Sequence, residues 1–213
     1  CQNRRRVIVS QRGDSPSASS VEQIVLCPGS LQAQRGLLDT TSKAAHRGTM
    51  IHLLLELNRQ DFECAVELAA KRDELIEQIF PTGRKMTMKE QRLWVGSSYS
   101  GQADHIVTSA GTGLIIDYKT GTFPVTPAGE NKQLMALAVL LKANKPKLKT
   151  IYAAILQPTY EPELVCYDEQ SLAECKEYLE GKLEEANAED APRIGGDKQC
   201  HFCKAKEDCD EAL

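Results

Sequence analysis

The sequence predicts an α/β fold in which a mixed central sheet is flanked by helices. Runs of β-branched and aliphatic residues alternate with amphipathic helical patterns along the chain. These elements follow one another as a helical region, three strands, a helix and a further strand, with no internal repeat and no second domain visible. The chain has 213 residues, 41% of them hydrophobic and 26% charged, which is enough for one domain with a sizeable core.

Each element of this fold is predicted from its own periodicity and from the Gly, Pro and Ser residues that interrupt it. Helices are expected over 42–58, 61–80, 130–141 and 168–188, and strands over 85–95, 98–108, 114–119, 150–157 and 164–167. Residues 1–20 are polar, with three arginines and then a Ser/Pro-rich stretch, and they predict a flexible arm. Residues 21–213 are therefore expected to form the single domain.

The second and third strands carry acidic residues on a predicted β-hairpin, on either side of a Gly-rich turn. Side chains alternate between the faces of a strand, so Asp117 and Lys119 point one way and Tyr118 the other. If the loop has an even number of residues, Asp104 lies on that same face, across from Asp117 or Lys119. Facing carboxylates repel by about 0.2–1 kcal/mol. A divalent cation between them would turn the repulsion into ligation, because one or two carboxylates commonly hold Mg²⁺.

Three short motifs follow one another through this region: Gly101-Gln102-Ala103-Asp104, then Asp117-Tyr118-Lys119-Thr120-Gly121, then Gln133-Leu134. In type and order they resemble the PD-(D/E)xK nucleases, and most closely the RecB-type branch. The resemblance extends over nearly the whole chain, from Cys27 to Cys209. One position departs from the family pattern, because Leu137 stands where a Tyr follows four residues after the Gln.

The resemblance implies a restriction-endonuclease-like core of the order αβββαβ and a catalytic set of Asp104, Asp117, Lys119 and Gln133. It also implies Mg²⁺ or Mn²⁺ held by His52, Asp104, Asp117 and the Tyr118 carbonyl. A lone His among apolar neighbours is more often packed in a core. Here the pattern Gly48, His52, Glu56 matches a family element whose His reaches the metal. Lys119 would orient a water or offset charge on a phosphate.

Glu90, on the strand expected over 85–95, has two interpretations. It can look toward the metal site, as a residue of the family's first strand does. It can also be an ordinary exposed strand glutamate, which is the interpretation adopted from the sequence.

Three cysteines near the C-terminal end, Cys200, Cys203 and Cys209, are spaced as C-x-x-C-x5-C in a short polar segment. No secretory segment is visible, so metal binding or buried thiols are expected rather than a disulfide framework. RecB-type iron–sulfur nucleases, including AddB-like proteins and CRISPR-adaptation nucleases, have one Cys ahead of the core and three after it. The resemblance therefore implies a [4Fe–4S] cluster that joins the two ends of the domain, with Cys27 as the fourth ligand. Zinc is the alternative, because four cysteines alone do not separate the two.

The function implied is that of a metal-dependent DNA nuclease, an exonuclease acting on single-stranded or duplex ends in recombination, repair or phage DNA processing. A recombination or repair protein would be its partner. The alternative is a catalytically silent DNA-binding or scaffold subunit. The net charge of −4 does not decide between them, because affinity for DNA comes from local Lys and Arg. No apolar run has the length of a membrane span. The expected location is the cytoplasm of a bacterial or phage-infected cell, a reducing compartment.

Overall fold

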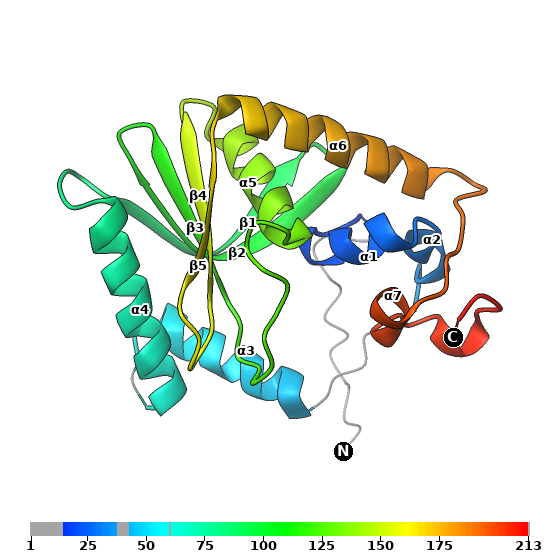
Figure 1. The fold of residues 1–213 in the computed structure, drawn as a ribbon, viewed down its shortest axis with the longest axis horizontal. Helices are drawn as coiled ribbons and strands as arrows, with labels where there is room; N and C mark the ends of the chain where they lie inside the picture. Colours follow the sequence, from blue (N-terminus) through cyan, green and yellow to red (C-terminus); the bar gives the residue numbers. More distant parts are fainter. Residues whose placement is uncertain (1–14, 38–42, 60, 213) are drawn as a thin grey trace, which may run out of the picture.

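The computed structural model describes residues 15–37, 43–59 and 61–212. At its centre is a five-stranded sheet whose strands follow the chain order, β1 to β5 (Figure 1). The strands are β1 (Met86–Val95), β2 (Tyr99–Ser109), β3 (Thr112–Tyr118), β4 (Thr150–Leu156) and β5 (Glu163–Tyr167). Only β3 and β4 run parallel, and the other neighbours are antiparallel. The prediction of a mixed sheet is confirmed.

Helices cover both faces of the sheet. Helix α5 (Lys132–Asn144) crosses between the parallel strands and packs on one face, with α6 (Glu169–Asn187) lying on it. The opposite face is covered by α3 (Lys43–Glu56) and α4 (Glu63–Ile79). The short helices α1 (Val21–Leu26), α2 (Ser30–Ala33) and α7 (Asp197–His201) lie together beside one end of the sheet (Figure 1). Each expected helix and strand is present within a few residues of its predicted bounds.

The apolar side chains of α5 explain its central position. All eight residues from Leu134 to Leu141 are buried. A helix that is apolar on every side is stable only when it is enclosed, and α5 lies between the sheet and α6. Its approach to β2 is so close that a Cβ at Gly101 would lie 2.8 Å from carbon atoms of Ala18, Leu137 and Leu140. The glycine of the first motif is therefore a packing requirement.

The turn between β2 and β3 sets the register of the hairpin. Ser109 pairs with Thr112, so the loop consists of Ala110 and Gly111 alone. Both have positive φ, +43° and +89°, as a type I′ turn requires. The loop therefore has the even number of residues that places Asp104 opposite Asp117.

The flexible arm expected over residues 1–20 extends too far along the chain, because its last residues pack on the domain. Its residues 1–14 lie outside the described part of the chain. Ser17 and Ala18 are buried, and Ser17 bridges to Ser100 on β2. The Ser17 side chain accepts from the Ser19 N–H and caps the 3-10 turn Ala18–Ser20. These residues were assigned to the arm because they are small and polar, but their hydroxyls satisfy the local backbone and allow the segment to pack.

Two further properties follow from the described residues. None of their helices has the length and apolarity needed to span a membrane. All seven cysteines in the described ranges are free thiols.

Candidate active site

Three carboxylates lie in a row across neighbouring strands. On β1 and β2, the pairs Lys89–His105 and Gln91–Ala103 flank Glu90 and Asp104, which are therefore opposite each other. On β2 and β3, the pair His105–Ile116 makes Asp104 and Asp117 the next facing positions. Like charges in facing positions are destabilising unless a cation or a proton lies between them.

A local irregularity of the backbone brings Glu90 to this row. Its φ is +47°, a left-handed conformation that a non-glycine residue adopts at a cost in free energy. On the facing strand, Ala103 and Ile106 lie in the same core, although residues three apart on a regular strand point to opposite faces. The side-chain alternation therefore breaks at Glu90 and Asp104. The interpretation of Glu90 as an ordinary exposed strand residue is wrong, because its side chain lies among site residues.

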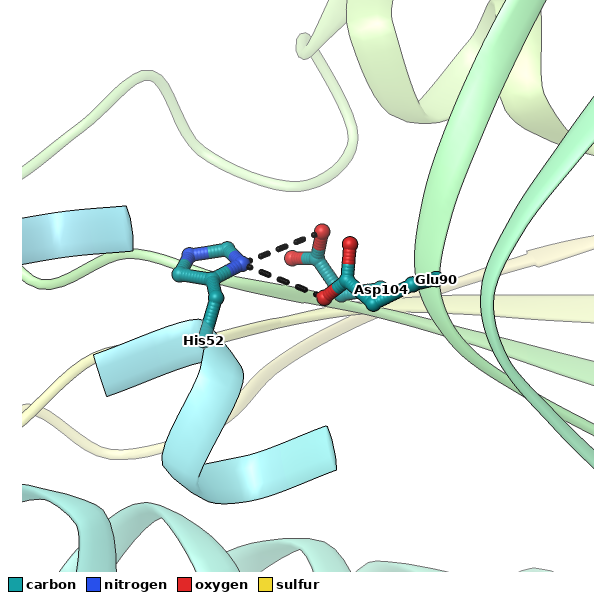
Figure 2. A group of neighbouring side chains, drawn as sticks. All are labelled: His52, Glu90 and Asp104. Carbon is teal, nitrogen blue, oxygen red and sulfur yellow. Dashed lines mark ion pairs between the residues drawn. The ribbon is translucent and has the colours of Figure 1, made fainter. Parts of the chain in front are cut away.

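Helix α3 brings His52 to these carboxylates (Figure 2). Its Nδ1 lies 3.4 Å from an Asp104 oxygen and 3.6 Å from a Glu90 oxygen. Its Nε2 lies 3.2 Å from the Tyr118 carbonyl oxygen. The glycine one turn earlier allows the approach, since a Cβ at Gly48 would lie 3.1 Å from Thr120 Oγ1. The Gly-x-x-x-His spacing thus has a physical reason in this fold.

The electrostatics of this group favour a positive charge at its centre. Burial lowers the pKa of His52, but hydrogen bonds to Asp104 and Glu90 and their negative charges outweigh burial and raise that pKa to about 10. Burial acts to raise the pKa of Glu90, but hydrogen bonds from His52 and Gln102 outweigh burial, so the pKa of Glu90 is lowered. The imidazolium supplies the charge that the two carboxylates need. A bound cation would replace it.

Asp117, Lys119 and Gln133 form a second, connected group. The Lys119 ammonium lies 2.7 Å from Asp117 Oδ2 and donates to Gln133 Oε1 at 3.0 Å. The Gln133 amide in turn donates to Asp117 Oδ1 at 2.7 Å. Gln133 is in the first turn of α5, capped by Asn131, whose side chain accepts from the Leu134 N–H. Gln133 thus contacts Lys119 directly and is placed to support its position.

Burial has a strong effect on Asp117, whose exposed fraction is 3%. Burial raises the pKa of Asp117, the Lys119 charge opposes that rise, and the Asp104 charge adds to it. Its Oδ2 has no hydrogen bond of good geometry within the described ranges, only the ion pair with Lys119. A buried carboxylate oxygen left in this state is suited to a metal ligand.

Tyr118 links the two groups through its backbone. Its N–H donates to Asp104 Oδ2 at 2.7 Å, and its carbonyl faces His52. The Tyr118 ring lies on the other face, in the core beneath α3 and α4. This is the alternation expected from the sequence, with the ring directed away from Asp117.

The expected residues are thus brought together, with one difference in grouping. Ligand atoms of His52, Glu90 and Asp104 all lie within 4.8 Å of one another, a spacing suited to one ion. Asp117 is not part of that group, and its oxygens contact Lys119 and Gln133. Leu137, at the position of the family's Tyr, is fully buried against β2 and does not reach the site.

The four cysteines of the expected cluster line one pocket, between the α1–α2 region and the C-terminal segment. Cys27 and Cys200 are buried, and Cys203 and Cys209 are partly buried. The Ile194 N–H donates to Cys27 Sγ at 3.2 Å. Gln23 donates to the Gln199 carbonyl at 2.8 Å, which ties the two regions together.

Comparison with known proteins gives a family and a fold. A family model described as "Protein of unknown function (DUF2800)" matches residues 15–79 and 74–213. The chain belongs to this family. No curated protein matches it.

Among solved structures, SSO0001 is similar, with a TM-score of 0.50 and 15% identity over 94% of this chain and 87% of that chain. An alkaline exonuclease from Laribacter hongkongensis has a TM-score of 0.42 and 15% identity over 84% of this chain and 90% of its own. A phage-related exonuclease from Haemophilus somnus 129PT has a TM-score of 0.38 and 14% identity over 81% and 92%. At such identities, the similarity to SSO0001 indicates a shared fold and nothing about activity.

Proposed function

We propose that this chain is a divalent-metal-dependent DNA nuclease of the PD-(D/E)xK type, in its RecB-like branch. The observation that carries the proposal is the row of Glu90, Asp104 and Asp117 across three strands, with Lys119 beside Asp117 and His52 opposite. Two acids and a histidine whose ligand atoms lie within 4.8 Å of one another, with a third acid in the next facing position, are an oxygen-rich site for a hard cation.

In this proposal Mg²⁺ or Mn²⁺ is held by Asp104, Asp117, His52 and the Tyr118 carbonyl, with Glu90 as a further ligand or a partner of His52. The fit rests on the Asp117 Oδ2 atom without a well-formed hydrogen bond and on the compact His52–Glu90–Asp104 group. When bound, such a cation polarises a phosphate and lowers the pKa of a bound water.

The side chains around Asp117 have separate roles. Lys119 is held by Asp117 and Gln133 but keeps part of its surface exposed, so its ammonium is available to a phosphate oxygen or to the attacking water. Gln133 fixes both partners of that ion pair through two hydrogen bonds and acts as a positioning residue.

The cysteine pocket is proposed to hold a [4Fe–4S] cluster on Cys27, Cys200, Cys203 and Cys209. The four thiols lining one pocket are the donor set that either zinc or an iron–sulfur cluster takes, and the cluster is preferred here on the one-plus-three cysteine spacing shared with RecB-type nucleases. The N–H···S bond from Ile194 to Cys27 is of the kind that adjusts cluster potentials. Iron and acid-labile sulfide analysis of anaerobically purified protein tests this assignment, and zinc alone would refute it.

Hydrolysis of end-labelled linear DNA tests the nuclease directly. The wild-type chain is incubated with Mg²⁺, with Mn²⁺ or with chelator, beside Asp117→Ala and an exposed-acid control, Asp190→Ala. We expect metal-dependent loss of full-length DNA that Asp117→Ala abolishes and Asp190→Ala retains. The order of label release then distinguishes exonuclease from endonuclease action.

A second candidate function is a DNA-binding scaffold that has lost catalysis, and the observation that favours it is Leu137 in place of the family's Tyr. Leu137 is buried in the core, so the site lacks any side chain from that position. Wild-type binding to DNA without hydrolysis under either metal would establish the scaffold in place of the nuclease.

A further inference from the structure

A solvent-exposed phenylalanine lies in the loop that follows β3. Phe123 follows Lys119 by four residues and has 84% of its surface exposed. An isolated exposed apolar residue is common on protein surfaces and by itself indicates nothing. The hydrogen bonds of its loop and its position beside the site make Phe123 different.

The loop that carries Phe123 is fastened in place. Gln157, only 3% exposed, donates to the carbonyl oxygens of Gly121 and Phe123, each at 2.7 Å. The Tyr160 hydroxyl donates to the Thr122 carbonyl at 3.1 Å. Three hydrogen bonds therefore hold three consecutive residues.

The two residues that hold this loop, Gln157 and Tyr160, are themselves held by helix α4. Lys71 on α4 donates to the carbonyls of Gln157 and Tyr160, at 3.0 and 2.7 Å. The backbone that carries the Phe123 ring is therefore fixed, while the ring itself is exposed. A ligand that binds the ring has to order one side chain but not the loop.

The loop begins beside the candidate active site. In Figure 1 the connection from β3 to α5 runs toward α3 before it returns, and Thr120 lies against Gly48, one turn before His52. Four residues of extended chain span at most about 14 Å. Phe123 is therefore within roughly four stacked nucleotides of Lys119, at about 3.4 Å for each nucleotide.

We propose that Phe123 stacks on an unpaired base of the nucleic acid, so that the substrate is DNA with a single-stranded end. This inference rests on the proposed nuclease function. A phenyl ring cannot bind phosphate, because it offers neither charge nor a hydrogen-bond donor, whereas every nucleobase has a face on which it can stack. Inside a duplex those faces are covered by neighbouring bases. The ring therefore favours single strands over blunt duplexes, with little dependence on sequence.

The test measures binding and hydrolysis separately. Binding of a fluorescent single-stranded 12-mer and of a blunt duplex is followed by anisotropy in Ca²⁺, and hydrolysis of both is followed in Mg²⁺. Phe123→Ala is expected to bind the single strand about 5- to 150-fold more weakly, the range observed for loss of one stacked base, with duplex binding unchanged. Phe123→Trp is expected to restore binding. Phe62→Ala, which removes a ring that is 47% exposed at the start of α4, is the control and should match wild type.

The outcomes are distinguishable. Unchanged single-strand affinity in Phe123→Ala overturns the stacking inference, and so does an equal loss on both substrates, or a wild-type chain that binds no single strand. A selective loss in binding with no hydrolysis by wild type under any metal supports stacking and refutes the nuclease. Thermal unfolding of Phe123→Ala checks that the exposed ring does not contribute to folding.

Discussion

Replacing Gly101 by alanine is the most direct test of how the fold supports the site. The new methyl group would lie 2.8 Å from Ala18 Cβ, Leu137 Cδ2 and Leu140 Cδ1. Carbon atoms in contact are ordinarily about 3.5–4.0 Å apart, so each neighbour would have to retreat by roughly 0.7 Å or more. All three neighbours are buried, and two belong to the fully enclosed helix α5. The core therefore has no free side chain that can move away cheaply.

Overpacking of this kind costs about 1–3 kcal/mol of unfolding free energy. In a chain of this size that corresponds to a melting temperature about 2–12 °C lower. The proposed nuclease activity should fall more steeply, because Gly101 is three residues from Asp104 on the same strand. A displacement of about 1 Å at a catalytic group can reduce a rate about 100-fold.

Equilibrium urea denaturation and the linear-DNA assay measure the two effects. Gly181→Ala is the matched control, since it is the same substitution at an exposed position of α6 with no atom within 4 Å of the new Cβ. Helix propensity predicts that it stabilises the chain by up to about 1 kcal/mol. If Gly101→Ala unfolds within about 0.5 kcal/mol of wild type, the close approach of β2 and α5 is not a packing constraint and the argument fails.

Three further predictions follow from groups in or near the site. Burial and the charges of Arg72 and Lys89 lower the pKa of His105 from 6.5 to about 4, so the unfolded chain binds more protons between those values. The unfolding free energy should therefore decrease by up to roughly 3 kcal/mol as pH falls from about 6.5 to 4. Urea titrations at several pH values measure this dependence, and it should be weaker in His105→Gln. Gln133→Ala removes a hydrogen-bond donor from the buried Asp117. We expect kcat to fall about 10- to 100-fold and the unfolding free energy to fall by about 1–3 kcal/mol. An unchanged kcat would contradict the positioning role of Gln133. Cys203 is a ligand of the proposed cluster, so Cys203→Ala should lower both iron content and melting temperature, because metal binding contributes to folding, while Cys166→Ala, at an exposed thiol, should change neither.

Periodicity and turn residues in the sequence were sufficient to predict most helices and strands of this fold. The sequence predicted that Asp104 faces Asp117 or Lys119 on the condition that the turn had an even number of residues, and the two-residue Ala110-Gly111 turn meets that condition. The enclosure of α5 is also readable, because an unbroken apolar stretch cannot face water. That α5 packs closely on Gly101 cannot be predicted in this way, since it depends on which helix crosses which strand.

For Glu90 the family resemblance offered the site-facing position as one of two interpretations, but strand periodicity favoured the exposed one, for a different physical reason. Strand alternation places a residue on one face by counting, and counting fails where one residue adopts a left-handed conformation. No local signal marks that position, because Gly and Asn are the usual residues there and Glu is not. The burial of Ser17 and Ala18 could likewise not be predicted from the sequence, because it depends on their packing against β2.

The left-handed Glu90 also bears on how this protein could be engineered. A positive φ at a non-glycine residue costs about 1–3 kcal/mol, and a glycine there would recover part of it. A search for thermostable variants would therefore favour Glu90→Gly while removing a carboxylate from the site. Stability and the proposed chemistry make opposite demands on this one residue, so selection for heat resistance alone would favour loss of a carboxylate from the candidate site.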